Sequence, residues 1–170
     1  EGEVEIGPYE GENPLFQHGP VRVSESNRYL EHQDGTPFFW LADTWWHGLT
    51  RRFRWPEDFQ TLTADRVSKG FSVVQIVAGL LPEITPRDQV WSEWSENEAG
   101  WAWEEDFTRI NPRFFDAADQ RIAHLVESGL LPCIFGAWGY YLRYAGTENM
   151  KKHWRYLVAR YGAYPVVWCI

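Results

Sequence analysis

Four apolar runs alternate with three helix patterns along this chain of 170 residues. The apolar runs predict strands over 37–42, 71–77, 130–136 and 164–170. Each helix pattern opens with helix-start residues and closes at a glycine, which predicts helices over 56–69, 111–129 and 147–162. Strict alternation of strands and helices is typical of parallel strands joined by crossover helices. The chain is therefore expected to adopt an α/β fold.

Two α/β architectures fit this alternation. A nucleotide-binding doubly wound sheet usually carries a Gly-x-Gly-x-x-Gly turn after its first strand, whereas this turn reads Asp43-Thr44-Trp45-Trp46. The first half of a (β/α)₈ TIM barrel is therefore favoured, and such barrels usually take about 250 residues. Because the fourth strand runs to Ile170, we expect a truncated barrel with strands one to four. Its uncovered apolar edges would make the isolated piece aggregate or dimerise.

The first 20 residues are rich in glycine and proline, which is typical of a linker. Residues 1–13 are assigned to the tail of an upstream domain with this linker, and residues 14–170 to the truncated barrel. Strand candidates at 21–23 and 29–31 predict a β-hairpin before the first barrel strand. The turn signal Asp34-Gly35 follows them and leads into that strand.

Charge and composition argue against several classes of function. A formal net charge of −8 disfavours nucleic acids and anionic membranes as partners, and no window of about 18 apolar residues predicts a membrane span. The five histidines are dispersed, so we expect no metal site and no cofactor. Cys133 and Cys169 lie in separate apolar runs, which favours two buried free thiols and leaves a disulfide open. No targeting signal is recognised at the N-terminus.

Polar and aromatic residues gather where the predicted strands end, which is where barrels bind ligands. A tryptophan offers a flat apolar face, and a carboxylate accepts hydrogen bonds from hydroxyl groups, so the two together suit a sugar ring. The candidate substrate-binding residues are Asp43, Trp45, Trp46, Gln75, Trp138 and Tyr140. Alternatives stay open: Asp43-Thr44 could be a simple cap, Gln75 could pair with a loop backbone, and His47 could be structural or a pocket donor.

A loop of about 33 residues, 78–110, follows the second predicted strand and is far longer than usual. It holds four tryptophans, which argue against disorder, and we interpret it as a lid or groove wall with stacking surfaces of its own. Glu98 is the one loop acid weighed as a ligand, although Asn97-Glu98-Ala99-Gly100 also fits a turn. The four tryptophans are Trp91, Trp94, Trp101 and Trp103.

Over about residues 14–170 the chain resembles the apiosidase-like glycoside-hydrolase family, whose catalytic domain is a (β/α)₈ barrel. The resemblance rests on a set of short motifs that are specific only in combination. They are Asn13-Pro14-Leu15, His18-Gly19-Pro20, the segment from Asp34 to Trp46, Lys69-Gly70-Phe71, and the segment from Ala159 to Trp168. Residues 1–12 resemble the end of the β-sandwich domain that often precedes such barrels.

The resemblance implies hydrolysis of plant or microbial polysaccharides or oligosaccharides by a pair of carboxylates. In barrels of this kind these groups are expected after strands four and seven, so both would lie beyond Ile170 and no catalytic residue is expected in this chain. The segment would supply substrate-binding residues and need the C-terminal half of the barrel. A secreted or periplasmic location is slightly favoured by the resemblance alone.

Two other classes of function remain open. A non-catalytic carbohydrate-binding barrel would share all the aromatic features of the strand ends. A structural or partner-docking protein would instead bury these aromatic rings. An acidic residue just beyond the fourth strand would favour the enzyme over the binding module.

Overall fold

The computed structural model describes residue 3, residues 7–81, residue 91 and residues 93–170. A short helix, α1 (Pro14–Gln17), precedes a three-stranded antiparallel sheet. Its strands are β1 (Val21–Val23), β2 (Leu30–His32) and β3 (Pro37–Phe38), in the order β1-β2-β3. The expected hairpin is therefore present, with one strand added.

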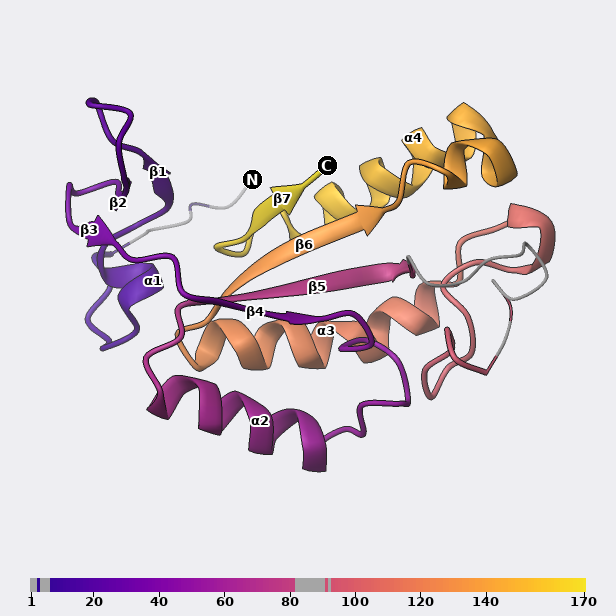
Figure 1. Cartoon of the computed structure of the whole chain (residues 1–170), viewed down its shortest axis with the longest axis horizontal. Helices are drawn as coiled ribbons and strands as arrows, with labels where there is room; N and C mark the ends of the chain where they lie inside the picture. Colours follow the sequence, from indigo (N-terminus) through magenta and orange to yellow (C-terminus); the bar gives the residue numbers. More distant parts are fainter. Residues whose placement is uncertain (1–2, 4–6, 82–90, 92) are drawn as a thin grey trace.

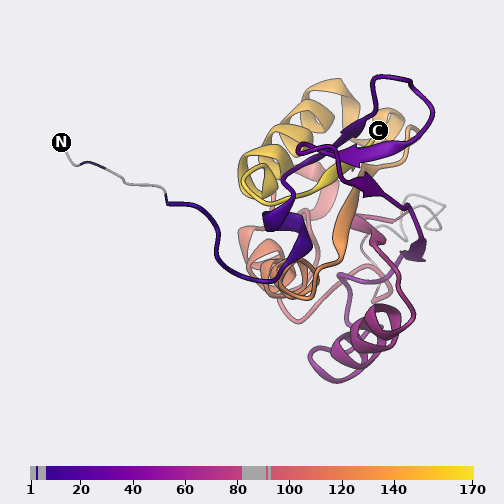
Figure 2. The same ribbon diagram turned by 90° about the vertical axis from the view of Figure 1, so that its left-hand side faces the viewer.

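The body of the protein is a four-stranded parallel sheet in the order β4-β5-β6-β7 (Figure 1). Its strands are β4 (Ala42–Trp45), β5 (Val73–Leu80), β6 (Leu131–Ala137) and β7 (Val167–Cys169). The crossover helices are α2 (Glu57–Ser68), α3 (Pro112–Glu127) and α4 (Tyr141–Tyr161). Figure 2 shows these helices in an arc around the outside of the strands. The sheet is a partial (β/α)₈ barrel, which confirms the predicted fold class.

The first barrel strand differs from the prediction. The run expected as one strand over 37–42 is divided between two sheets: Phe38 pairs with Leu30 in the antiparallel sheet, and Ala42 pairs with Val73 in the parallel one. The link between them is exposed, with Phe39 76% accessible. An apolar run alone does not reveal such a division, because length and hydrophobicity are the same for one strand or two short ones. Asp43 consequently lies within β4 and not after it.

The start of the third predicted helix also differs from the prediction. Helix α4 begins at Tyr141, six residues before the predicted start at Thr147, and it is interrupted at Gly146, where φ is +77° and ψ is +163°. Glycine adopts a positive φ without the steric cost that a Cβ would bring. The predicted helix therefore corresponds to the part after the kink, which runs to Tyr161. In the part of the chain that the structure describes, no helix has the length and apolar character needed to cross a membrane.

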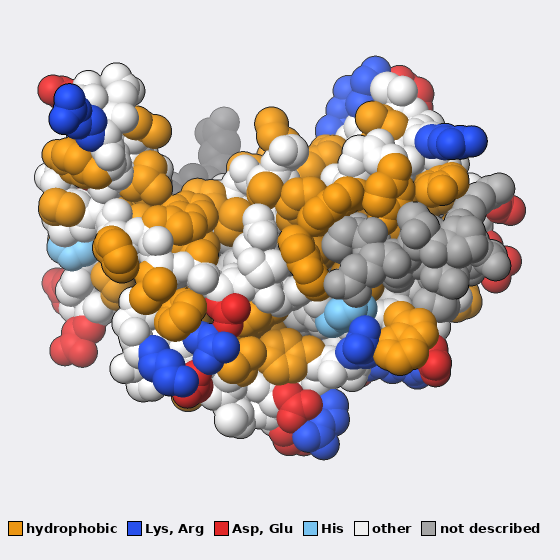
Figure 3. All heavy atoms as spheres, viewed as in Figure 1, with side chains coloured by type: hydrophobic (Ala, Val, Ile, Leu, Met, Phe, Trp, Pro, Cys, Tyr) orange, Lys and Arg blue, Asp and Glu red, His pale blue; other side chains and the backbone are white. Residues whose placement is uncertain are grey.

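Two apolar layers hold the fold together. The larger one packs the outer face of the sheet against the three helices, and Phe59, Phe114 and Leu157 in these helices are fully buried. The smaller one lies on the inner face, where Val73, Leu131 and Cys133 pack with Leu15 of α1. In Figure 3, hydrophobic side chains gather across the middle of the molecule, over the strands.

The connection between β5 and α3 is partly built into the core. Trp103, Phe107 and Ile110 are buried in the larger apolar layer, and Trp103 forms a β-bridge with Ile110. The interpretation of the whole loop as a lid with stacking surfaces is therefore wrong for Trp103, which is 1% exposed. Residues 82–90 and residue 92 of this loop lie outside the described residues.

Candidate functional site

The carboxyl ends of the parallel strands and the β5–α3 connection lie at one end of the sheet, and the antiparallel sheet lies at the other (Figure 1). Side chains alternate along β4, as they do in any strand. Asp43 and Trp45 contact helix α2, whereas Thr44 contacts Gln75 on the opposite face. The predicted site residues are thus divided between two faces of the sheet.

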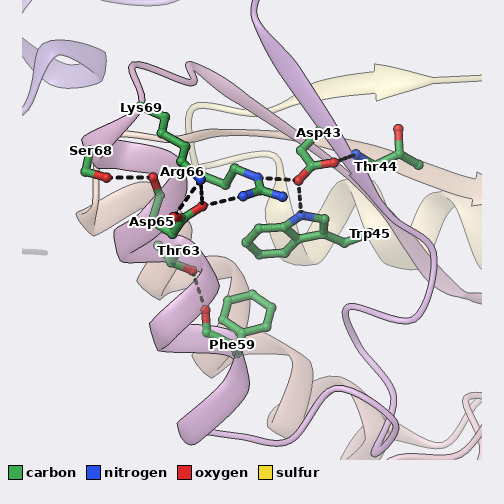
Figure 4. Close-up of polar contacts among 9 residues, drawn as sticks. All are labelled: Asp43, Thr44, Trp45, Phe59, Thr63, Asp65, Arg66, Ser68 and Lys69. Carbon is green, nitrogen blue, oxygen red and sulfur yellow. Dashed lines mark hydrogen bonds and ion pairs between the residues drawn. The ribbon is translucent and has the colours of Figure 1, made fainter.

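Asp43 is occupied by protein donors on the helix side (Figure 4). Its Oδ2 accepts hydrogen bonds from Nε of Arg66, at 2.5 Å, and from Nε1 of Trp45, at 3.0 Å. Its Oδ1 accepts a bond from the backbone N–H of Thr44 at 2.9 Å. Partial burial alone would raise the pKa of Asp43, but the bonds from Trp45 and Arg66 outweigh burial and lower that pKa. The Asp43 carboxylate therefore binds donors of the protein itself. Because Asp43 lies within strand β4, it does not cap a helix.

Trp45 is not available as a stacking surface. Its ring is 6% exposed and packs edge-to-face on Phe53 and Phe59, with centroid distances of 5.3 and 5.2 Å. Its one polar atom, Nε1, donates to Asp43. The expected stacking role of Trp45 is therefore wrong, because Trp45 lies two residues after Asp43 in β4 and its ring points to the same face, toward α2.

Trp46 and Trp138 meet at the carboxyl end of the sheet. Their rings are edge-to-face with centroids 5.2 Å apart, and Trp138 also packs on Phe135 at 4.0 Å. Trp46 follows β4 and Trp138 follows β6, so the contact passes over the end of β5, which lies between them. Both rings are half-buried. The two indoles pack against the core on one side and stay partly accessible on the other, so together they form an aromatic wall.

Gln75 lies on the inner face of the half-barrel. Its Oε1 accepts from the hydroxyl of Thr44 at 3.5 Å, and its Nε2 lies 3.5 Å from Sγ of Cys169 and 4.0 Å from Sγ of Cys133. The alternative that Gln75 pairs with a loop backbone is not what these contacts show. Both cysteines are free thiols, as expected, with Cys133 buried and Cys169 half-buried.

Tyr140 stands beside the aromatic wall at the start of α4. Its hydroxyl donates to the carbonyl of Leu81 at 3.0 Å, and its ring stacks on Tyr141 at a centroid distance of 4.8 Å. The hydroxyl of Tyr141 donates to the same carbonyl. The bond to Leu81 and the stacking on Tyr141 fix the position of the Tyr140 ring beside the wall.

The described acidic side chains near this end of the sheet are paired with arginines. Glu98 binds Arg121 at 2.6 Å and Glu96 binds Arg51 at 2.7 Å. Burial alone would raise the pKa of Glu98, yet the hydrogen bond from Arg121, a backbone hydrogen bond and the charge of Arg121 together outweigh burial and lower that pKa. Glu98 is therefore the partner of a fully buried arginine and not a free ligand.

The arginine partners were absent from the sequence-based site. Arg66 lies 23 residues after Asp43, and Arg121 lies 23 residues after Glu98, so no local spacing connects them. An arginine on the inner side of a predicted helix was the only available signal, because a buried guanidinium needs a carboxylate. Among the described residues, no group of three or more histidine, cysteine, aspartate or glutamate side chains could hold a metal ion.

His47 lies in a polar cluster next to the site. Its Nε2 is 3.0 Å from Arg52, and the Arg52 guanidinium lies 4.3 Å from the centre of the Trp94 ring. Trp94 is 51% exposed, and it is the most exposed of the four loop tryptophans, since Trp91 and Trp101 are half-buried and Trp103 is buried.

Comparisons with known proteins agree with this architecture. The model of the family described as apiosidase-like, catalytic domain, matches residues 24–170. A solved structure titled as a glycoside hydrolase is 25% identical, with a TM-score of 0.70, over 94% of this chain and 35% of that one. A glycoside hydrolase family 5 structure from Bacteroides vulgatus is 23% identical, with a TM-score of 0.71, over 96% of this chain and 34% of that one. The comparison with curated proteins found no match.

The chain spans about a third of the length of these solved structures. Their titles name glycoside hydrolases, and the family model covers nearly all of the partial barrel and both aromatic residues of the wall. The expected family resemblance is confirmed on these grounds. The chain belongs to the apiosidase-like family, within its catalytic domain.

Proposed function

We propose that this segment forms the substrate-binding part of a glycosidase active site that acts on plant or microbial polysaccharides or oligosaccharides. The contact between Trp46 and Trp138 carries the proposal, because it presents two half-buried indoles at the carboxyl end of the parallel strands. Active sites of barrel enzymes lie at this end. An indole face packs well against the apolar face of a sugar ring.

Gln75 and Tyr140 are assigned to orienting the sugar. Gln75 is held on the inner face of the sheet by Thr44 and Cys169, and it is half-buried there. Tyr140 is fixed by its bond to Leu81 and by its stacking on Tyr141. Fixed polar groups of this kind select among hydroxyl patterns at little entropic cost.

Asp43 is assigned a positioning role in place of direct binding to sugar hydroxyls. Its oxygens already accept from Trp45, Arg66 and the Thr44 backbone, which fixes the end of β4. Trp46 is the next residue after β4, so these hydrogen bonds help to fix the position of its indole ring in the wall. The effect of Asp43 on the substrate would therefore pass through Trp46.

The catalytic carboxylates are assigned to parts of the barrel other than these 170 residues. The described acids nearest the strand ends, Asp43, Glu96 and Glu98, are all paired with arginines. An arginine partner stabilises the charged form, whereas a general acid needs a raised pKa. In this proposal the intact protein uses two carboxylates, one as general acid/base and the other as nucleophile or base.

The test is hydrolysis by the intact protein of a panel of pectin, arabinan, xylan and β-glucan, measured as released reducing ends. On the substrate that is cleaved, Trp138→Ala and Trp46→Ala should each lower kcat/KM about tenfold, which corresponds to ~1.4 kcal/mol of lost binding. Trp40→Ala is the matched control, since Trp40 is 41% exposed and lies in the link before β4. Its kcat/KM should equal that of the parent.

The alternative is a non-catalytic carbohydrate-binding barrel. Binding of an oligosaccharide from the panel in calorimetry, with no reducing ends released by the intact protein, would favour it over the enzyme. Both assignments fail if Trp46→Ala and Trp138→Ala fold normally and change neither binding nor turnover.

A further inference from the structure

A cavity lies on the helix side of the sheet, away from the aromatic wall. It has a volume of about 820 Å³ and lies between the N-terminal end of α3 and the middle of α4. Ile110, Pro112 and Tyr156 provide its apolar lining. Cavities of about 300–1,000 Å³ are typical of small-ligand sites.

The charged lining of this cavity is strongly basic. Arg109, Arg113, Lys152 and Arg155 line it together with a single acid, Glu104. Glu104 is occupied by Arg109, which donates to it from Nε at 3.0 Å and from the terminal nitrogen at 2.6 Å. Within the described part of the chain, no hydrogen bond or ion pair is found for the side chains of Arg113 and Arg155.

This concentration of positive charge contrasts with the protein as a whole, which carries a formal net charge of −8. Like charges around one cavity repel one another, so the cluster is costly unless an anion neutralises it. The N-terminal end of α3 opens on the same cavity and adds partial positive charge. An anionic group is therefore the chemistry that the cavity favours.

The apolar lining indicates what the anion is attached to. Tyr156 is held in place because its hydroxyl accepts from Arg160 at 2.7 Å and its ring packs edge-to-face on Phe115 at 5.0 Å. A fixed tyrosine ring beside Ile110 offers packing area to a ring-bearing ligand. Free inorganic anions would leave that surface unused.

We propose that this cavity binds a small ring-bearing molecule with a carboxylate or phosphate group, of the size of a sugar acid or sugar phosphate. Arg113, Lys152 and Arg155 hold the anionic group, and Tyr156 packs against the ring. Guanidinium groups bind carboxylates and phosphates through paired hydrogen bonds, which makes the arginines the main anchors. The site is separate from the proposed glycan site and does not depend on hydrolysis.

The test is calorimetric titration of the intact protein with glucuronate, glucose 6-phosphate, glucose and inorganic phosphate. Glucose 6-phosphate or glucuronate should bind at least about tenfold more tightly than glucose, since charge-assisted hydrogen bonds are stronger than neutral ones. Whichever anionic sugar binds more tightly identifies the anionic group. Inorganic phosphate should bind more weakly than the better sugar, because it has no ring to pack on Tyr156.

Variants locate the binding. The double variant Arg113→Gln with Lys152→Gln should weaken the Kd of the better sugar about tenfold or more, and all the substituted side chains are exposed, so folding should be preserved. Arg28→Gln is the matched control, because it removes one exposed charge elsewhere and should leave the Kd unchanged. A melting curve for each variant verifies folding.

Three results would overturn the proposal. One is equal affinity for glucose and for both anionic sugars, and another is an unchanged Kd in a folded double variant. The third is inorganic phosphate binding as tightly as the better sugar. Loss of hydrolysis in the polysaccharide assay would not affect this titration, so the two proposals fail independently.

Discussion

Asp43 in β4 and Arg66 in α2 are joined by an ion pair of 2.5 Å, and the same carboxylate oxygen accepts the indole N–H of Trp45. The three side chains connect the first barrel strand to its crossover helix on the side away from the barrel interior (Figure 4). Both charged side chains are only about a quarter exposed, at 27% for Asp43 and 23% for Arg66. The pair is therefore better shielded from solvent than an ordinary surface ion pair.

Asp43→Asn should lower the free energy of unfolding by about 1–2 kcal/mol, because the amide loses the charge that binds Arg66 and leaves Asp65 as the remaining carboxylate partner of the guanidinium. Urea unfolding at pH 7 measures the change. The pKa of Asp43 is lowered in the folded state, so its contribution is present above the unfolded pKa and is lost as the pH falls through the folded value. The difference between parent and variant should therefore shrink in acid.

The control for this measurement is Asp58→Asn. Asp58, in the first turn of α2, pairs with Arg54, which precedes the helix and is 70% exposed, so solvent screens the charges. Its unfolding midpoint should equal that of the parent within error. Equal midpoints for Asp43→Asn and the parent would show that the ion pair does not stabilise the strand.

The sequence alone predicts those helices and strands whose residues follow a regular hydrophobic pattern. Helix α3 runs over 112–127 against a prediction of 111–129, because Asn111 and Pro112 start it and its buried residues recur at helical spacing. Strand β6 lies at 131–137, within one residue of its prediction, since a doubly covered strand is a continuous apolar run. Local signals determine both elements.

The arrangement of the site residues could not be predicted from local sequence patterns, because it depends on how the strands pair. Whether Trp45 or Trp46 faces the helices follows from the register of β4 on β5, and a shift of one residue exchanges the two faces. The placement of Trp138 beside Trp46 depends on the closure of the sheet around β5. Sequence spacing therefore identified the aromatic residues at the strand ends without separating the core tryptophan from the accessible ones.

His153 should make the protein less stable in mild acid. It is fully buried, its Nδ1 accepts from Trp103 at 3.1 Å, and its Nε2–H donates to the carbonyl of Gly136 at 2.9 Å. Burial lowers the pKa of His153 to about 4, although the bond to Gly136 opposes it. The unfolded chain, with a pKa of about 6.5, binds a proton first, so stability falls as the pH drops below that value.

This group alone should make the protein roughly 2 kcal/mol less stable at pH 5 than at pH 7. Urea midpoints at the two pH values measure the difference. His153→Gln should reduce the pH dependence, while His18→Gln, which alters a half-buried histidine paired with Asp34, should retain the contribution of His153. An unchanged pH dependence in His153→Gln would refute the assignment.

Gly136→Ala should destabilise the protein through overpacking. A Cβ at this position would lie 2.5 Å from Cζ2 of Trp154, which packs on Trp168 of β7. Forcing these rings apart costs about 1–3 kcal/mol, measured by urea unfolding. Gly139→Ala, three residues later, is the matched control because no atom lies within 4 Å of its added Cβ. Equal stability of the two variants would contradict the packing of β6 against α4.

The thiol of Cys133 should be inert in the folded protein. It is 5% exposed and lies on the inner face of the half-barrel near Gln75. Burial, together with the neighbouring Cys169, raises its pKa to about 11, so little of the reactive thiolate forms at pH 8.

The Cys169→Ala variant leaves Cys133 as the one cysteine of the chain and removes only the smaller of these two causes. In that variant, a colorimetric disulfide reagent at pH 8 should react roughly 100-fold more slowly in buffer than in denaturing urea, because burial limits both ionisation and access. Comparable rates in the two solvents would mean that the inner face is open to solvent down to Cys133, and that the Gln75 cluster does not form as described.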